Sequence, residues 1–191
     1  MKESGKLLHK KEKNRIEMLL TDPDNFGGIS QLDSKILQEP GFYCIKLKEK
    51  SKLPTRYQTI LELRDYKYIY IGKAEKTIKQ RLDQELEHKS PSTFFRSIGC
   101  VLGYLPIKGH LIDKVNQNNF KFSKSDTKEI INWLRDNIEV SVAIYEGNFN
   151  CRILWKIICH YLWKSTCRLQ KLEELINDRK RCKNIARGIE V

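Results

Sequence analysis

The chain has 191 residues, of which 40% are apolar and 31% are charged. This length is typical of one domain, and the apolar content is sufficient for a hydrophobic core, which excludes a globally disordered chain. Lysine and arginine number 36 against 24 acidic residues, so the formal net charge is +12. Such an excess favours a polyanionic partner, most commonly nucleic acid. A basic protein with no such partner is the alternative.

Neither a membrane span nor a disulfide framework is indicated. No apolar run approaches the roughly 18–20 residues that a transmembrane helix needs, and residues 1–6 lack the apolar stretch of a signal peptide. The six cysteines are scattered without a Cys-x-x-Cys pair, which argues against a zinc ribbon or a thioredoxin-like site. We therefore expect a cytoplasmic protein with free thiols and no membrane partner. The oligomeric state is not predicted.

Residues 1–37 are predicted to be a basic N-terminal helix and linker. Leucine and isoleucine recur at helical spacing among lysines over residues 6–20, which predicts an amphipathic helix, with a solvated arm as the alternative. Proline, glycine and aspartate in residues 22–28 indicate turns. A domain at 38–187 and a tail at 188–191 complete the expected division.

Three strands and several helices follow in the predicted domain. Residues 41–47, 67–72 and 138–145 read as strands, with an insertion at 48–66. Helices are expected at 76–88, 94–101, from Ser125 onward, over 151–163 and over 169–186. Ser125-Asp126 with Glu129 resembles a capping box, and Leu169, Leu172, Leu175 and Ile176 are expected to pack the last helix on the core.

Side chains suited to an anionic substrate gather after the second strand. We interpret Gly72 as ending that strand in a sharp turn, since glycine carries no Cβ. Lys73 is the next residue. In the helix that follows, apolar residues recur every four positions and form one stripe that is expected to be buried. On an adjacent stripe, Arg81, Glu85 and His88 fall at i, i+4 and i+7, so they lie on one side of that helix. The buried stripe is made of Ile78, Leu82 and Leu86.

Two triplets resemble the paired signatures of the GIY-YIG nuclease superfamily. They are Gly41-Phe42-Tyr43, with phenylalanine in place of the usual isoleucine, and Tyr70-Ile71-Gly72; Arg81 matches the arginine of the following helix. Over roughly residues 38–186 the chain resembles small bacterial GIY-YIG proteins with a long spacer between the triplets. The resemblance implies an α+β fold with a small central antiparallel three-stranded sheet flanked by helices. It also implies endonuclease activity, the hydrolysis of DNA phosphodiester bonds with Mg²⁺ or Mn²⁺.

The resemblance also implies residue roles. Tyr43 matches the tyrosine that helps to deprotonate the attacking water; because a phenol has a pKa near 10, neighbouring cations or the metal must lower it. Arg81 matches the arginine that binds the scissile phosphate with its planar fork. Tyr70 matches the second tyrosine, Lys73 is a suitable cation, and His88 is a further candidate. Without the motifs, core tyrosines, solvated cations and a capping histidine are the ordinary interpretations.

Two glycines and several basic residues complete the candidate list. Gly41 and Gly72 are interpreted as structural turn residues. Five basic residues are candidates to contact the DNA backbone: Arg96, Lys108, Lys114, Lys121 and Lys124. Phe120 and Phe122 interleave with lysine, but packing explains these phenylalanines at least as well.

One expected element is missing from the sequence. The family's metal-binding glutamate is expected near Ile153, yet no Glu or Asp occurs between Glu146 and Glu173. Glu146 is the remaining weak candidate for a metal ligand. Without a carboxylate, Mg²⁺ binding is weakened, so a non-catalytic nucleic-acid-binding relic is the alternative function. Segment 151–167 holds three cysteines and two tryptophans, and either compensated frameshifts or ordinary divergence accounts for it.

Overall fold

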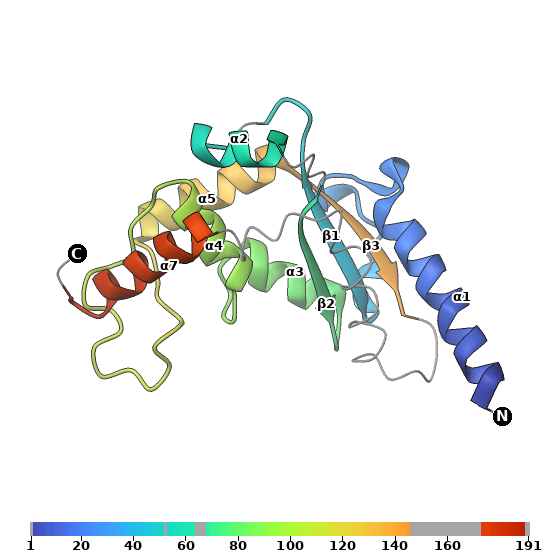
Figure 1. Cartoon of the computed structure of the whole chain (residues 1–191). Helices are drawn as coiled ribbons and strands as arrows, with labels where there is room; N and C mark the ends of the chain where they lie inside the picture. Colours follow the sequence, from blue (N-terminus) through green and yellow to red (C-terminus); the bar gives the residue numbers. More distant parts are fainter. Residues whose placement is uncertain (1, 52, 64–67, 146–172, 190–191) are drawn as a thin grey trace. The chain divides into compact units, whose positions relative to one another are not determined.

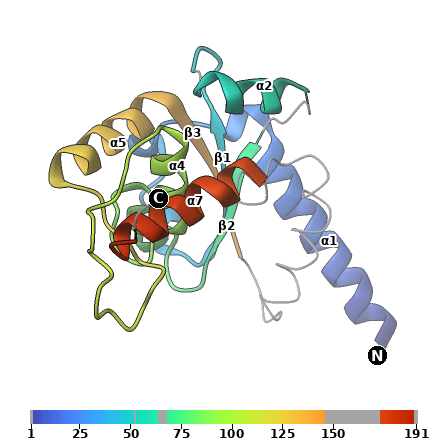
Figure 2. The same cartoon turned by 60° about the vertical axis from the view of Figure 1, so that its left-hand side comes forward.

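The computed structural model describes residues 2–51, 53–63, 68–145 and 173–189, within a chain that divides into two compact units. The first unit comprises Met1–Glu49, Arg64–Arg81 and Ile138–Cys167, and the second comprises Lys50–Leu63, Leu82–Asn137 and Arg168–Val191. Figures 1 and 2 show the chain from two directions. Helix α3 (Ile78–Leu86) carries the chain from the first unit into the second.

An antiparallel sheet of three strands forms the first unit, in the order β2-β1-β3. The strands are β1 (Gly41–Leu47), β2 (Tyr68–Ala74) and β3 (Ile138–Ile144). The first five residues of β1 are buried, as expected for a central strand that is covered on both faces. The predicted α+β fold with a small three-stranded antiparallel sheet is therefore confirmed.

Helix α1 (Lys2–Thr21) packs against one face of this sheet (Figure 1). Ile16 and Leu20 lie one helical turn apart and are fully buried, which places both on one side of the helix. The hydroxyl of Ser141 in β3 donates to the carbonyl of Leu20 at 2.8 Å, so a carbonyl at the helix end is satisfied by the sheet. The predicted N-terminal helix is confirmed, and it contributes to the core of the unit. The remaining buried members of this cluster are Phe42, Cys44 and Ala143.

The segment between α1 and β1 is turn-rich, as predicted, and is attached to the sheet. It contains the short 3-10 helices η1 (Pro23–Asn25), η2 (Ile29–Gln31) and η3 (Ile36–Gln38). Gly27 and Val140 exchange two backbone hydrogen bonds, of 3.2 and 2.9 Å. The segment therefore extends the edge of β3 locally before the chain enters β1.

Four of the described helices lie wholly in the second unit: α2 (Thr55–Leu63), α4 (Thr93–Val101), α5 (Lys124–Asn137) and α7 (Glu173–Ala186). Helix α4 is the most buried of these, with every residue from Phe94 to Val101 buried. A Cβ added to Gly99 would lie 2.5 Å from the ring of Phe122 and 3.1 Å from Ile130 of α5. Gly99 therefore allows α5 and the preceding loop to pack closely on α4.

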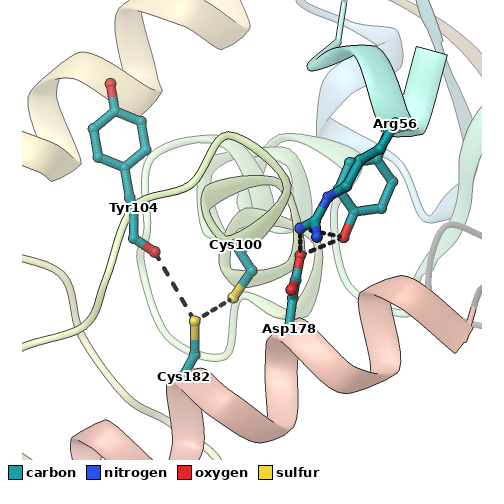
Figure 3. Close-up of polar contacts among 6 residues, drawn as sticks. Arg56, Cys100, Tyr104, Asp178 and Cys182 are labelled. Carbon is teal, nitrogen blue, oxygen red and sulfur yellow. Dashed lines mark hydrogen bonds and ion pairs between the residues drawn. The ribbon is translucent and has the colours of Figure 1, made fainter. Parts of the chain in front are cut away.

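Helix α7 is joined to both α4 and α2 by polar contacts (Figure 3). The thiols of Cys100 in α4 and Cys182 in α7 lie 3.0 Å apart. The hydroxyl of Tyr57 in α2 donates to Asp178 in α7 at 2.5 Å, and Arg56 forms an ion pair with the same carboxylate. The cysteines among the described residues are free thiols, as expected.

Helix α2 was not predicted, because the lysines and Pro54 of residues 48–66 suggested an irregular insertion. The carbonyl of Pro54 accepts from the N–H groups of Tyr57 and Gln58, so this proline begins the helix instead of preventing it. Tyr57 and Leu61, four residues apart, are the buried side chains of α2. A nine-residue helix with two buried positions is too short for a clear periodic signal.

Other predicted elements differ in detail. The start of α5 is capped by Ser123 and not by the predicted Ser125. The hydroxyl of Ser123 accepts from the N–H of Asp126 at 3.0 Å. In α7, Leu175 is buried as expected, but Ile176 is 38% exposed, so its predicted packing is wrong. Leu169, Leu172 and the predicted helix over 151–163 lie outside the described residues. No helix among the described residues is long and apolar enough to cross a bilayer.

Candidate active site

Two tyrosines from neighbouring strands lie together on one face of the sheet in the first unit. The ring centroids of Tyr43 in β1 and Tyr70 in β2 are 6.0 Å apart, with planes inclined by 32°. The register pairs Tyr43 with Gly72 and Ile45 with Tyr70, and paired residues in antiparallel strands share a face. The two rings are therefore diagonal neighbours. Tyr43 is fully buried and Tyr70 partly exposed, so Tyr70 is the more accessible ring.

Gly72 provides the space that the Tyr43 ring occupies. A Cβ at residue 72 would lie 2.0 Å from Cζ of Tyr43 and 2.1 Å from its hydroxyl oxygen. The sequence interpretation of Gly72 as the turn that ends the strand is wrong, because β2 continues to Ala74 and Gly72 lies within it. Glycine is required there for side-chain clearance and not for backbone freedom.

Gly41 also allows a close approach. It is the first residue of β1, and an added Cβ would lie 2.4 Å from the carbonyl oxygen of Ala143 and 2.9 Å from Cδ1 of Ile78. The N–H of Ile78 donates to the carbonyl of Glu39 at 2.9 Å. The turn role predicted for Gly41 is therefore replaced by a packing role, since the glycine lets the start of α3 lie against the start of β1.

Arg81 follows in the first turn of α3. The hydroxyl of Thr77 accepts from the N–H of Gln80 at 3.1 Å and so caps the helix, and the N–H of Arg81 donates to the carbonyl of Thr77 at 3.2 Å. Arg81 is half-buried. Because α3 is attached to the chain just before β1, Arg81 is held in the same unit as Tyr43 and Tyr70.

These positions agree with the comparison to known families. The family model of the GIY-YIG catalytic domain matches residues 41–150, which is more than half of the chain. The chain belongs to the GIY-YIG family. No curated protein and no solved structure matches it. Both triplets and Arg81 lie inside the matched region, whereas the segment that lacks the expected glutamate lies almost entirely beyond its end.

Lys73, which directly follows the second GIY-YIG triplet, pairs with Phe42 in the register. Phe42 belongs to the cluster that contacts α1, so the pairing assigns Lys73 to the sheet face opposite Tyr43. Its ammonium forms an ion pair with Glu75 at 2.6 Å. A catalytic role for Lys73 stays a prediction. Such a role requires its long side chain to reach around the edge strand β2 to the face that carries Tyr43.

His88 belongs to the second unit, where it lies just after α3 with a left-handed φ of 59°. Its ring packs on Phe95 with centroids 4.5 Å apart, and Nδ1 lies 3.1 Å from the hydroxyl of Ser92. Burial, followed by the charges of Arg96, Lys121 and His110, lowers the pKa of His88 to about 4. The imidazole is therefore neutral at neutral pH. Its catalytic role stays a prediction.

The five candidates for DNA-backbone contact divide into two groups. Arg96 is only 4% exposed; its Nη1 donates to the hydroxyl of Ser92 at 3.4 Å, and its guanidinium lies over the ring of Phe120 at 5.9 Å. Burial is the main cause that lowers the pKa of Arg96. The four lysines, in contrast, are exposed and available to a polyanion: Lys108, Lys114, Lys121 and Lys124. Phe120 and Phe122 are buried, which favours the packing interpretation.

A divalent metal site is not provided by the residues that the structure describes. Within ranges 2–51, 53–63, 68–145 and 173–189, no group of three or more His, Cys, Asp and Glu side chains is placed to hold an ion. Glu146, the position near Ile153 and the segment 151–167 lie outside those ranges. The described residues therefore provide no cluster of three or more such ligands, whereas Mg²⁺ in proteins is commonly held by one or two carboxylates together with substrate phosphates.

One polar residue of structural importance has no role in the predicted site. Glu85 is fully buried, and its carboxylate accepts from the N–H of Phe94 at 2.7 Å. It thereby satisfies a free donor at the start of α4, where the Ser92 side chain makes no capping bond. Its spacing from Arg81 places it on the same side of α3. Its bond to Phe94, nine residues later in the chain, produces no periodic pattern in the sequence, so sequence reasoning could not find it.

Proposed function

We propose that this protein acts on DNA as an endonuclease, hydrolysing phosphodiester bonds at a site that includes Tyr43, Tyr70 and Arg81. The observation that supports the proposal most strongly is the tyrosine pair, whose rings lie 6.0 Å apart on one sheet face. Membership of the GIY-YIG family supports a nuclease. The net charge of +12 supports a polyanionic substrate.

The side chains suggest a division of work. The guanidinium of Arg81 is suited to bind two oxygens of the scissile phosphate and to stabilise the charge that develops on it. Tyr70, as the more accessible ring, is suited to hold the phosphate or the attacking water. Tyr43 is suited to orient that water, and it accepts a proton only if a nearby cation such as Arg81 lowers its pKa.

Cleavage of supercoiled plasmid is the direct test. The full chain, incubated with Mg²⁺ or Mn²⁺, is expected to convert supercoiled DNA to the nicked form. Arg81→Ala is expected to reduce the rate by on the order of a hundredfold or more, as for the loss of other transition-state charge contacts. Tyr43→Phe keeps the buried ring and removes only the hydroxyl, so it tests that group without a cavity.

A matched control removes an arginine charge elsewhere. Arg135 has a side chain that is 61% exposed and lies 3.7 Å from Glu87, in a salt bridge of little energetic value. Arg135→Ala is expected to nick plasmid at the wild-type rate. Equal nicking by wild type and Arg81→Ala would show that the proposed site is not the one responsible.

A second candidate function is DNA binding without cleavage. It is favoured by one observation, the absence of any Asp or Glu in residues 147–172, where the family's metal ligand is expected. In this case the protein retards DNA in a salt-sensitive manner but nicks no plasmid with either metal. Binding that is weakened by Arg81→Ala, together with no nicking, would establish this function in place of the first.

A further inference from the structure

An exposed apolar surface lies on the loop between α4 and α5. Residues 105–115 are called here the apolar loop. Four of its aliphatic side chains are at least 45% exposed, and that of Val115 is completely exposed. Several exposed aliphatic side chains within eleven residues are candidates for contact with a partner. Phe120 and Phe122, in the same connection between α4 and α5, are buried and do not belong to this exposed surface. The four exposed residues are Leu105, Ile107, Ile112 and Val115.

Backbone hydrogen bonds attach the apolar loop to the end of α7. The N–H of Gly109 donates to the carbonyl of Ile185 at 3.1 Å, and the N–H of Leu111 donates to that of Ala186 at 2.7 Å. Leu111 is 1% exposed and anchors the loop in the unit. Figures 1 and 2 both show this loop, in yellow-green, beside the C-terminal end of α7. The loop is therefore ordered before any partner binds.

The tip of the apolar loop is also supported from within. The carbonyl of Leu111 accepts from the N–H of Lys114 at 3.1 Å and from the side-chain amide of Gln117 at 3.0 Å. Cδ1 of Ile112 lies 3.3 Å from where a Cβ of Gly188 would be, so one side of Ile112 rests on the chain after α7. Pre-ordering of this kind reduces the entropy lost when Ile112 and Val115 enter a binding site.

The charge around the apolar loop identifies the kind of partner. Residues 105–124 contain four exposed lysines and one acidic residue, Asp113, so the segment has a net charge of +3. Lysine is depleted at protein–protein interfaces. Proteins that bind the DNA minor groove, in contrast, use basic side chains and frequently insert apolar wedges between base steps. The mixture of lysine and exposed aliphatic side chains therefore favours duplex DNA over a protein partner.

We infer that the apolar loop inserts Ile112 and Val115 between base pairs from the minor groove of duplex DNA, while Lys108 and Lys114 contact the flanking phosphates. The inference rests on the proposed action on DNA and adds that this protein unstacks and bends its substrate. Because unstacking costs less at a mismatch or at a flexible pyrimidine–purine step, duplexes that contain one are the preferred ligands.

Fluorescence of 2-aminopurine, which rises when the base unstacks, tests the inference with the full chain and a short duplex containing a mismatch. Wild type is expected to raise the fluorescence on binding. Ile112→Ser/Val115→Ser is expected to abolish the rise and to weaken binding by on the order of tenfold, through loss of apolar burial. Lys108→Gln/Lys114→Gln is expected to keep the rise at saturation but to reduce the salt dependence of log K by roughly two.

Control variants separate the possible outcomes. Leu63 in α2 is 80% exposed in the same unit, so Leu63→Ser is expected to leave binding and fluorescence unchanged. Val115→Ser alone changes a fully exposed side chain, so this variant is expected to keep the fold, which thermal unfolding verifies. It is also expected to reduce the fluorescence rise.

The inference is overturned if wild type binds DNA and Ile112→Ser/Val115→Ser unstacks it equally well, whereas the proposed action on DNA then stands. If wild type binds no DNA at any salt concentration, the proposed function fails together with the inference. Unchanged unstacking, combined with a shift from dimer to monomer in sedimentation of the double variant, would make the apolar loop a protein contact and would also overturn the inference.

Discussion

The ring of Tyr43 lies in the space that any side chain at residue 72 would occupy, with Cζ 2.0 Å from the position of the missing Cβ. The two residues are directly paired between β1 and β2. The second triplet thus positions the tyrosine of the first triplet, because its glycine is the wall against which that ring packs. This relationship accounts physically for the pairing of the two triplets in the candidate active site.

Gly72→Ala is therefore expected to destabilise the protein by roughly 1–3 kcal/mol through overpacking and to reduce any activity that depends on Tyr43. Urea unfolding measures the stability. In a Tyr43→Ala background the same change is expected to cost much less, since the opposing ring is gone. Gly28→Ala is the control, because there the nearest atom is the end of the flexible Gln31 side chain at 3.3 Å. Equal costs for Gly72→Ala in both backgrounds would contradict the packing explanation.

His88 predicts a pH dependence of stability. Its pKa is lowered from 6.5 to about 4 in the folded protein, so between those values the unfolded chain binds more protons. The stabilising effect of the neutral imidazole is complete above pH 6.5 and is lost as the pH falls toward 4. Urea midpoints measured from pH 7 to pH 4 are expected to decrease.

His88→Asn is the matched variant, since asparagine tolerates the left-handed backbone of this position. It is expected to flatten the pH dependence specifically between pH 4 and 6.5. A variant with the same slope as wild type in this interval would assign the acid sensitivity to other groups.

Cys100 and Cys182 are expected to form a disulfide on mild oxidation. Their sulfur atoms are 3.0 Å apart and both residues are 3% exposed. Diamide accepts the two electrons and two protons that the thiols release as the S–S bond forms. In the chain-entropy account, a cross-link between positions this far apart in sequence stabilises by about 4.5 kcal/mol, so the melting temperature is expected to rise.

Peptide mass spectrometry identifies this cross-link, and Cys182→Ser removes it. Cys44 provides the comparison, because it is buried in the first unit and burial raises the pKa of its thiol. A diamide product that joins Cys44 to either residue, or no cross-linked peptide at all, is inconsistent with the contact in Figure 3.

Asp178 is expected to matter more for stability than its ion-pair partner. Asp178→Ala leaves the hydroxyl of buried Tyr57 without its acceptor, which costs roughly 1–3 kcal/mol. Arg56 has a side chain that is 56% exposed, so Arg56→Ala is expected to cost less than about 1 kcal/mol. Chemical denaturation of both variants measures the difference. Equal losses would show that the ion pair, and not the tyrosine hydrogen bond, joins α2 to α7.

Much of the fold was predictable because its signals are local. Alternating and β-branched residues indicated β1 and β3, and the spacing of Ile78, Leu82 and Leu86 indicated α3, where all three are buried. Helix α2 was missed because its signal is short. The start of α4 was predicted from its local residues, but its capping acceptor was not, since that acceptor is Glu85 on the preceding helix.

The sequence by itself determined the family-level features: the two triplets, the arginine on the following helix, the basic charge and the absence of acidic residues in 147–172. These depend on residue identity and spacing, which the amino-acid sequence itself contains. Only the tertiary structure decided which residues meet. It showed that Gly72 makes room for Tyr43, that Lys73 pairs with Phe42 instead of a tyrosine, and that the apolar loop is held against α7. Each depends on strand register or on contacts between distant segments, and a one-residue change of register would reverse the face of every side chain.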